Sequence, residues 1–473
     1  MKKRLFILGL DCATPQLIFD RFFDELPCLA KIISLSKEYG LLRSTDPPVT
    51  IPAWMSMFTG KDPGQLGFYG FTDRLNYSYN ETHIVNSNDL EDKTVWDYLS
   101  EKGLESIVIS VPQTYPPKPI KGILISGFLT PDKRLPFTYP REIQKEVEDI
   151  TQGYIFDVEN FMMRDKKKIL SSLYEMTRKR FKLAKEFLVN KKWDMFVMVE
   201  IAVDRLHHSF WRYCFSEHRL FRKGNKFESA ILDYYKFIDK EISELLSLLP
   251  EDAVLMIVSD HGAKSSKGTF HLNDWLVQNG YLHLKRNVKK KENLNTEDID
   301  WFKTTAWAKG GYYGRIFLNL KGRERYGIVP PNQADKLKKE IARKLAFLSG
   351  PSRERVKNII KFPEKIYKDT KNFPPDMIFY CGELDWRVSN SVGNKSLFST
   401  EEQSEADNAN HDFNGIFIIS LYPKEINKRN IKLRKKDLKS LKKYSILSIA
   451  PTILNFFDIK IPKGLSGKVI KIN

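Results

Sequence analysis

The chain has 473 residues, about three times the length of a typical single domain, so it fits one large α/β domain with insertions or two to three smaller units. Hydrophobic residues make up 42% and aromatic residues 12%, which supplies enough apolar surface for a core and excludes a largely disordered chain. The net charge of +18 attracts phosphorylated or nucleic-acid partners but says nothing about the fold.

Neither a membrane span nor a secretory signal is indicated. No apolar run approaches the roughly 20 residues that a spanning helix needs. The apolar stretch near the N-terminus ends at Asp11, which is too early for a signal core, so we expect a first β-strand there. The four cysteines, at positions 12, 28, 214 and 381, lack CxxC spacing and indicate neither a disulfide framework nor a cysteine zinc site. A soluble cytoplasmic protein is therefore expected.

Much of the positive charge lies in two lysine-rich segments, at 285–291 and 428–443. A nucleic-acid surface should interleave such charge with aromatic side chains or belong to a recognisable binding module, and neither segment does. We interpret both as solvated surface, so a nucleic acid is not expected as a specific partner.

Short apolar runs alternate with segments of helical spacing, of which the clearest spans 169–188. This alternation predicts the α/β class, with a mostly parallel central sheet and helices on both faces. The runs expected to be buried strands are Leu5–Leu10, Ser106–Val111, Met195–Ile201, Ala253–Val258 and Gly415–Ser420.

Two stretches interrupt this alternation. Residues near 130–190 begin with several prolines and continue into the long helical pattern, which predicts a helical excursion. Residues 285–400 contain short strand-like runs and a basic helix at Ala334–Leu348, which predicts an inserted cap. The expected organisation is a core formed by residues 1–284 and 401–473, with the cap region between them.

Residue types that bind metal ions follow three of the expected strands. These are Asp11, Asp204, and the adjacent Asp260 and His261. Ligands of open parallel sheets bind at the carboxyl ends of the strands, although a single aspartate there is more often a helix N-cap. Asp204 and His208 are four residues apart, which places both on one helix face and suits chelation, with an ordinary helix-start ion pair as the alternative.

Two further candidates are His411, which precedes the last expected strand, and Thr50. Prolines on both sides of Thr50 restrict the backbone around its hydroxyl. A threonine is a weak nucleophile until a base or a metal lowers its pKa. Its alternative role is that of a turn residue before a helix at Ala53–Phe58. The whole set of carboxylates and imidazoles is large enough to hold two metal ions.

The order of these residues resembles the alkaline phosphatase superfamily, specifically its type I phosphodiesterase/nucleotide pyrophosphatase-like branch and the related predicted phosphohydrolase/phosphomutase proteins. The resemblance extends from the first strand to the last and implies an alkaline phosphatase-like core. The motifs that carry it are Gly9-Leu-Asp11, Thr50, Thr59-Gly60-Lys-Asp-Pro-Gly64, Asp204-x-x-x-His208, Ser259-Asp-His-Gly262, His411 and Ala450-Pro-Thr-Ile-Leu454.

The resemblance implies a phosphohydrolase that uses two divalent metal ions, with zinc expected and manganese as the alternative. The substrate would be a phosphodiester or phosphomonoester, cleaved through a covalent phosphothreonine at Thr50. The ion that activates the nucleophile would be bound by Asp11, Thr50, Asp260 and His261. The other ion would be bound by Asp204, His208 and His411.

One position departs from the nucleotide pyrophosphatase pattern. The asparagine that holds a phosphate oxygen 21 positions after the nucleophile is replaced here by Phe71, which weakens a nucleotide-specific reading. Lys61 or Arg74 could supply a compensating charge. A phosphomutase that uses the same phosphoenzyme is the nearest alternative, although mutases of the superfamily use serine rather than a residue like Thr50. A non-catalytic binding protein with a vestigial site is the alternative from another class.

Overall fold

The computed structural model describes residues 3–159, 161, 165–400, 408–421, 433 and 435–471. Their contacts divide them into two compact units. The first unit holds the described residues of Met1–Leu66, Val85–Ala263 and Glu405–Asn473, and the second those of Gly67–Ile84 and Lys264–Ser404. The expected insertion of 285–400 lies entirely within the second unit, together with 67–84 and 264–284. That this segment caps a functional site stays a prediction.

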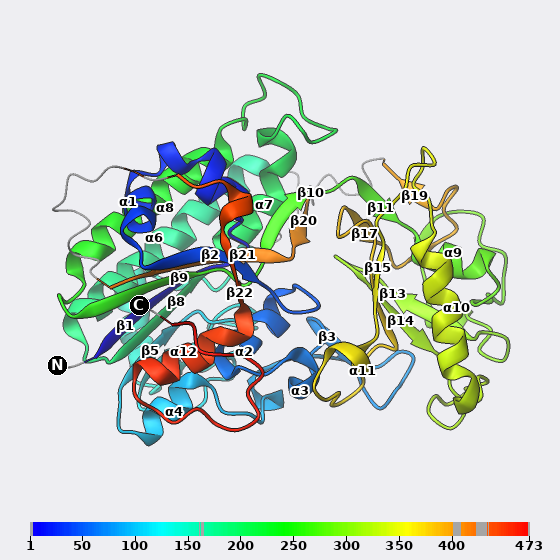
Figure 1. Ribbon diagram of the computed structural model, residues 1–473, viewed down its shortest axis with the longest axis horizontal. Coiled ribbons are helices and arrows are strands. Elements are labelled where there is room, and N and C mark those ends of the chain that lie inside the picture. The colour runs from blue at the N-terminus through cyan, green and yellow to red at the C-terminus, as the bar shows by residue number, and fades with distance from the viewer. Residues whose placement is uncertain are drawn as a thin grey trace. The chain divides into compact units, whose positions relative to one another are not determined.

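Within the described residues, nine strands form the central sheet of the first unit (Figure 1). In spatial order they are β22 (Lys442–Ser445), β2 (Glu38–Arg43), β21 (Asn414–Ser420), β9 (Ala253–Val258), β1 (Arg4–Leu10), β8 (Met195–Glu200), β5 (Ser106–Ile109), β6 (Gly122–Ile125) and β7 (Thr138–Tyr139). Seven of these described strands share one direction, and only β21 and β7 oppose it. The mostly parallel sheet predicted from the sequence is confirmed.

The central strands form because their residues are apolar on both faces, as expected for a sheet covered on both sides. Every residue of β8 and β9 is buried, and β1 pairs with both of them. All five apolar runs singled out in the sequence are strands of this sheet. β5 ends two residues earlier than predicted because Ser110 takes a left-handed backbone conformation with φ of 58°, which turns the chain out of the sheet.

Helices cover both faces of the sheet, as Figure 1 shows. The long helix predicted over 169–188 is α6, and it packs on α7 and α8. The helices of one face are α1 (Pro27–Leu35), α6 (Lys166–Asn190), α7 (Ala202–Cys214) and α8 (Ala230–Leu248). Those of the other face are α2 (Thr50–Thr59), α4 (Val95–Glu101) and α12 (Ile449–Phe456). The same unit also contains α3 (Pro63–Leu66) and α5 (Ile143–Thr151).

A buried ion pair supports the turn from β8 into α7. The side chains of Arg180 and Glu200 are fully buried, and Arg180 Nη1 donates to Glu200 Oε1 at 2.6 Å. The same oxygen accepts the backbone N–H of Ala202 at 2.9 Å, which is the first residue of α7. Two charges with matched partners can stay buried in this way, whereas either one alone would be strongly destabilising. The pair therefore fixes the start of the helix that carries Asp204.

The second unit is built around antiparallel strands. Its largest sheet has the order β13 (Ala306–Lys309), β14 (Gly314–Leu318), β16 (Met377–Tyr380) and β15 (Ile359–Lys361). Its smaller strands are β3 (Thr72–Arg74), β4 (Thr82–Ile84), β11 (Gly268–Phe270), β12 (Glu292–Asn293), β17 (Trp386–Val388), β18 (Ser391–Val392) and β19 (Phe398–Ser399). Its helices are α9 (Leu272–Gln278), α10 (Ala334–Ala346) and α11 (Pro363–Ile366), of which α10 confirms the predicted basic helix.

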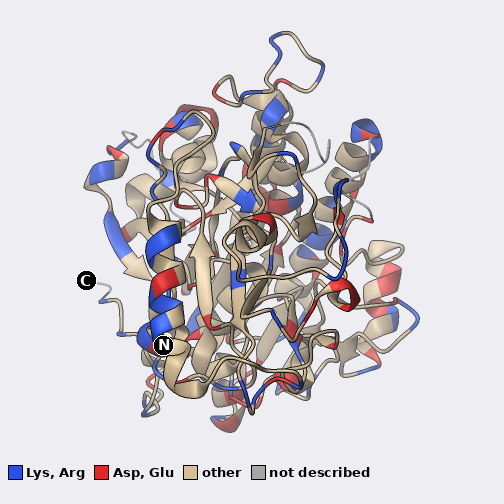
Figure 2. Ribbon diagram, turned by 90° about the vertical axis from the view of Figure 1, so that its right-hand side faces the viewer, with Lys and Arg blue, Asp and Glu red and all other residues tan. Residues whose placement is uncertain are grey.

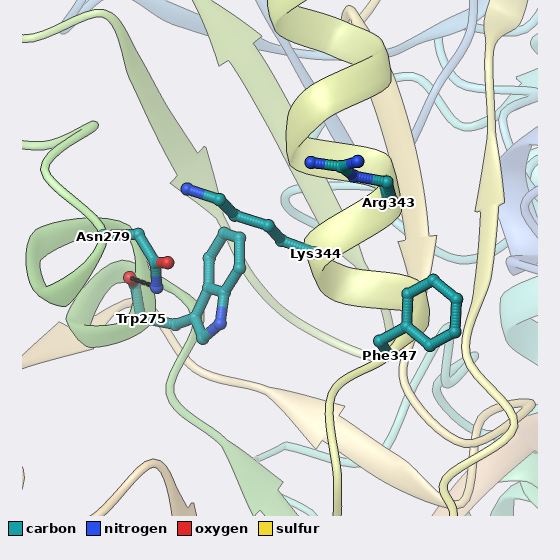
Figure 3. Close-up of a pocket in the computed structure, with 5 residues that line it drawn as sticks. All are labelled: Trp275, Asn279, Arg343, Lys344 and Phe347. Carbon is teal, nitrogen blue, oxygen red and sulfur yellow. Dashed lines mark hydrogen bonds between the residues drawn. The ribbon is translucent and has the colours of Figure 1, made fainter.

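A surface pocket of the second unit lies between α9 and α10 (Figure 3). Lys344 extends from α10 toward Trp275 and Asn279 on the α9 side, while Arg343 and Phe347 line the other wall. None of these five side chains is among the candidate site residues, all of which belong to the first unit.

The basic charge is dispersed. Figure 2 shows Lys and Arg interspersed with Asp and Glu along the ribbon. The lysine-rich segment at 285–291 belongs to the second unit, whereas 428–432 and 434 lie outside the described residues. Among the helices that the structure describes, none has the length and apolar character needed to cross a membrane.

Candidate metal centre

Three aspartates meet at one edge of the central sheet because adjacent parallel strands end there. Asp11 follows β1, Asp260 comes two residues after β9, and Asp204 lies in the first turn of α7, just after β8. β8, β1 and β9 are neighbours that run in the same direction. All three side chains are buried. Strand ends at such an edge are where ligands of open α/β sheets bind.

Asp11, Asp260 and His261 form one ligand group, with one ligand atom of each within 4.8 Å of the others. His261 Nε2 lies 3.2 Å from Asp260 Oδ2 and 3.8 Å from Asp11 Oδ1. The second oxygen of each carboxylate is held by the protein. Asp11 Oδ2 accepts from Trp54 Nε1 at 2.7 Å, and Asp260 Oδ1 accepts from the Cys12 backbone N–H at 3.1 Å. Each carboxylate is thus oriented with one oxygen toward the group.

Asp204 is the centre of the remaining ligand atoms. His208 Nε2 lies 3.2 Å from Asp204 Oδ1, as expected for residues four apart on one helix face, and His411 Nε2 lies 3.9 Å from the same oxygen. Two further three-residue groups share Asp204: one with His261 and His411, and one with His208 and Cys12. The six predicted carboxylate and imidazole ligands therefore form one continuous buried cluster. Cys12 joins it, although its sequence spacing gave no metal-site signal.

His411 reaches the cluster because β21 runs against its neighbours. The residue lies in the short strand β20 (Ala409–Asp412), immediately before β21. Since β21 is antiparallel to β9, its amino end lies at the edge where β9 has its carboxyl end. His411 Nδ1 is 2.7 Å from the carbonyl oxygen of Pro48. A carbonyl only accepts hydrogen bonds, so Nδ1 carries the proton and Nε2 presents a lone pair.

Thr50 is the first residue of α2, and two contacts fix this end of the helix beside the cluster. Pro48, two residues earlier, accepts from His411, and Trp54, one helical turn later, donates to Asp11. Thr50 and Trp54 are four residues apart and so share one helix face. The helix begins three residues earlier than expected, since Pro52 is compatible with a first helical turn. The Thr50 side chain is buried with the rest of the site.

Arg205 controls the orientation of Asp204. Arg205 Nη1 donates to Asp204 Oδ2 at 2.7 Å, while Nε and Nη2 donate to the Asp157 carboxylate at 2.9 Å each. The guanidinium carbon lies 4.8 Å from the Phe128 ring centre and 4.4 Å from that of Phe161. The guanidinium N–H groups are thus bonded to Asp157 and to Asp204 Oδ2. Arg205 thereby holds the Asp204 carboxylate with its other oxygen, Oδ1, toward the histidines.

The electrostatics of the buried cluster favour a bound cation. Burial, followed by the nearby Asp204 charge, raises the pKa of Asp11, and burial together with Asp11 raises that of Asp260. Burial would also raise the pKa of Asp204. His208 and Arg205 outweigh the effect of burial and hold this pKa well below its usual value. Burial lowers the pKa of His261 to about 4, which leaves its imidazole neutral, the form that binds metals.

Buried ligand atoms without hydrogen-bond partners indicate whether the cluster suits metal ions. Among the described side chains, four buried ligand atoms of this cluster lack a hydrogen-bond partner: Asp11 Oδ1, Asp204 Oδ1, Asp260 Oδ2 and His261 Nε2. A buried polar atom without a partner is costly, and four in one cluster point to a missing common partner. Carboxylate oxygens and imidazole nitrogens are ligands that zinc and manganese accept. The residues therefore fit divalent metal ions.

Three further polar residues, which lie in or near the sequence motifs, have partners outside the ligand set. His207 Nε2 pairs with the Tyr235 hydroxyl at 3.1 Å. Lys61 forms an ion pair with Asp92. In the second unit, Arg74 pairs with the buried Glu324.

The sequence predicts that Asp204 belongs to one of two metal sites. At that site we expect Arg205→Lys to weaken metal binding by about 10–100-fold while binding at the other site is unchanged, because outer partners of metal ligands typically contribute this much. Lysine cannot reproduce the fork that bridges Asp204 and Asp157. Metal titration calorimetry would measure both sites. Arg178→Lys, at an exposed position of α6, is the matched control, and equal weakening in both variants would contradict the role given to Arg205.

The central sheet, the helices on both its faces and the aspartate–histidine cluster at its edge define an alkaline phosphatase-like α/β protein. The sequence model of the family described as type I phosphodiesterase/nucleotide pyrophosphatase matches residues 5–414. The chain belongs to this family, and it is a phosphoric ester hydrolase of the alkaline phosphatase superfamily. A search of curated proteins returned no match.

Two solved structures share the fold. Phosphonoacetate hydrolase from Sinorhizobium meliloti 1021, in complex with phosphonoformate, has 15% identity and a TM-score of 0.56, covering 88% of this chain and 90% of its own. Murine ectonucleotide pyrophosphatase/phosphodiesterase 5, an inactive variant in complex with AMP, has 11% identity and a TM-score of 0.55, covering 98% of this chain and 97% of its own. At these identities the likeness establishes the fold alone.

Proposed function

We propose that this protein hydrolyses a phosphodiester or phosphomonoester through a covalent phosphothreonine on Thr50, at a site that holds two divalent metal ions. The observation that carries the proposal is the buried cluster of three carboxylates and three imidazoles, with unpartnered ligand atoms in it, next to the start of α2. Family membership supports the same chemistry.

The ligand sets proposed from the sequence are compatible with the geometry of the cluster. Asp11, Asp260 and His261 would hold one ion together with Thr50, and Asp204, His208 and His411 would hold the other. When bound, the two ions would lower the pKa of the Thr50 hydroxyl and neutralise charge on the phosphoryl oxygens. Zinc is the expected ion, with manganese as the alternative.

Thr50 acts as the nucleophile in the proposed reaction. Its hydroxyl oxygen bonds to phosphorus as the leaving alcohol departs with a proton. Water then cleaves the phosphothreonine, restores the hydroxyl and releases the phosphoryl group. The first turn of α2 helps here because backbone N–H groups and the helix dipole favour negative charge at a helix N-terminus. Trp54 and Pro48 hold this turn in place through their contacts with Asp11 and His411.

The proposal covers phosphate esters as a class and names no single substrate. Phe71 occupies the position where nucleotide pyrophosphatases have an asparagine, which weakens the case for specificity toward nucleotides. A phosphomutase would share the phosphothreonine but return the group to a substrate hydroxyl instead of water. A vestigial binding protein would bind ligand without turnover.

A substrate panel tests the proposal. The purified protein is stripped of metal, reloaded with zinc or manganese separately, and assayed on aryl phosphodiesters, aryl phosphomonoesters, nucleotides and a phosphonate. We expect metal-dependent hydrolysis of at least one aryl ester, and ¹⁸O-labelled water should place the label in the released phosphate. Retention of about two metal ions per chain is expected. A protein that binds ions but turns over no ester, or whose product acquires no label from water, would contradict hydrolysis.

A further inference from the structure

Cys12 lies between the two ligand groups, and the proposed mechanism gives it no role. One ligand atom each of Cys12, Asp204 and His208 lies within 4.8 Å of the others, and all three residues are buried. The backbone N–H of Cys12 donates to Asp260 Oδ1 in the other group. The same residue therefore orients one ligand of the first group and places its sulfur among ligands of the second.

We propose that Cys12 is a thiolate ligand of the metal ion bound by Asp204 and His208. This inference rests on the proposed metal centre. The geometry that supports it is the grouping of the Cys12 sulfur with Asp204 and His208, all of them buried, and the position of Asp204 Oδ1, which lies 3.2 Å from His208 Nε2. A cation at this position would satisfy that oxygen and bring sulfur, oxygen and nitrogen donors around one ion.

The plain alternative is a structural thiol. Cys12 is fully buried, and its Sγ lies 3.4 Å from the carbonyl oxygen of Gly262, within range of a weak S–H hydrogen bond. That contact and a hydrogen bond between the thiol and Asp204 would hold the sulfur in the metal-free protein, but neither explains why His208 also lies beside it. The backbone of Cys12 also has φ of 63°, a left-handed conformation in which glycine would be free of steric cost. A side chain at this position therefore carries a conformational cost that glycine would avoid.

Coordination would change the chemistry of the site in a defined way. The S–H bond breaks, the proton is released to solvent, and the sulfur electron pair binds the ion. Thiolate is a soft ligand that favours zinc over manganese and magnesium. The inference therefore adds to the proposed function that the metal site containing Asp204 prefers zinc. It also gives Cys12 a role that CxxC spacing could not reveal.

Cobalt substitution provides the test, because Co(II) bound to thiolate absorbs in a near-ultraviolet charge-transfer band that oxygen and nitrogen ligands do not produce. The full-length protein is stripped, titrated with Co(II), and compared with Cys12→Ser and Cys12→Gly. Glycine suits the left-handed backbone, so this second variant should fold even if serine does not. Single replacements by serine of Cys28, Cys214 and Cys381 are the matched controls. Zinc and manganese affinities are measured by competition.

We expect the wild-type protein and the three controls to show the band, and both Cys12 variants to lose it. Zinc affinity at one site should fall by about 10-fold or more in the Cys12 variants, with manganese affinity nearly unchanged. Two bound cobalt ions without a band, or a band that survives in both Cys12 variants, would overturn the role of Cys12 and leave the metal centre standing. A wild-type protein that binds no cobalt would overturn the metal centre itself, and the inference with it.

Discussion

Thr50→Ala is expected to lower the turnover number by at least about 10³-fold, because the variant lacks the oxygen that would form the phosphothreonine. The change removes a small buried hydroxyl at the first position of α2 and leaves the Trp54 and Pro48 contacts in place. Asp11, Asp260 and His261 remain to hold the ion that Thr50 would join, so the fold and the metal content should be nearly normal. Steady-state assays on the best aryl ester, with metal analysis of the same preparation, measure both.

Two variants sharpen this test. Thr50→Ser keeps a hydroxyl and should retain measurable turnover and a phosphoserine trapped by acid quenching. Thr59→Ala removes a buried hydroxyl from the other end of the same helix, where it donates to Met55, and should keep nearly full activity. If purified Thr50→Ala turned over substrate at close to the normal rate, the covalent mechanism would be wrong.

Asp260→Asn is expected to abolish most activity and, in the metal-free protein, to raise stability. The neutral amide keeps an acceptor for the Cys12 N–H but is not one of the usual ligands of zinc, so one ion should be lost. Without metal, the wild-type carboxylate is buried near Asp11, and this environment raises its pKa. Removing the charge should therefore raise the melting temperature of the metal-free protein at pH 7 by roughly 2–4 °C or more.

The pH dependence follows from the sign of that shift. Because the pKa of Asp260 is higher in the folded than in the unfolded metal-free protein, the unfolded state loses its proton first as the pH rises. The contribution of Asp260 to wild-type stability therefore falls above about pH 4, and the advantage of Asp260→Asn grows from acid toward neutral pH. With zinc bound the sign should reverse, since only the wild type gains the full binding energy. Thermal unfolding of the wild type and the variant, with and without zinc, measures the two differences in melting temperature. An equal difference with and without zinc would contradict this account.

The local pattern of apolar residues was enough to predict the main strands of the central sheet. Buried parallel strands must be apolar on both faces, so β1, β5, β8, β9 and β21 could be read from short apolar runs. The long periodic segment of α6 was equally clear. Boundaries were less accurate: β5 ends early at the left-handed Ser110, and α2 begins early because a proline fits its first turn.

The aspartates of the cluster were predictable because their position depends on connectivity. A residue that follows a central parallel strand lies at the carboxyl edge of the sheet, wherever its neighbours come from in the chain. This rule made Asp11, Asp204 and Asp260 candidates, with a helix N-cap as the alternative, and helical spacing did the same for His208. Thr50 and His411 were candidates with less distinctive local motifs, and the resemblance to a known family gave each of them an expected role.

Contacts between distant segments were decided by the tertiary structure alone. His411 reaches the cluster because β21 runs antiparallel to β9, a direction that an apolar run does not encode. Arg205 is held by Asp157 and two aromatic rings that no spacing connects to it. Cys12 has no partner cysteine in sequence, yet its sulfur lies beside Asp204 and His208. The sequence by itself determined the strands, the helices and most ligand types, because these follow from periodicity and order. The orientation of each ligand depends on packing between remote residues, which only the folded chain brings together.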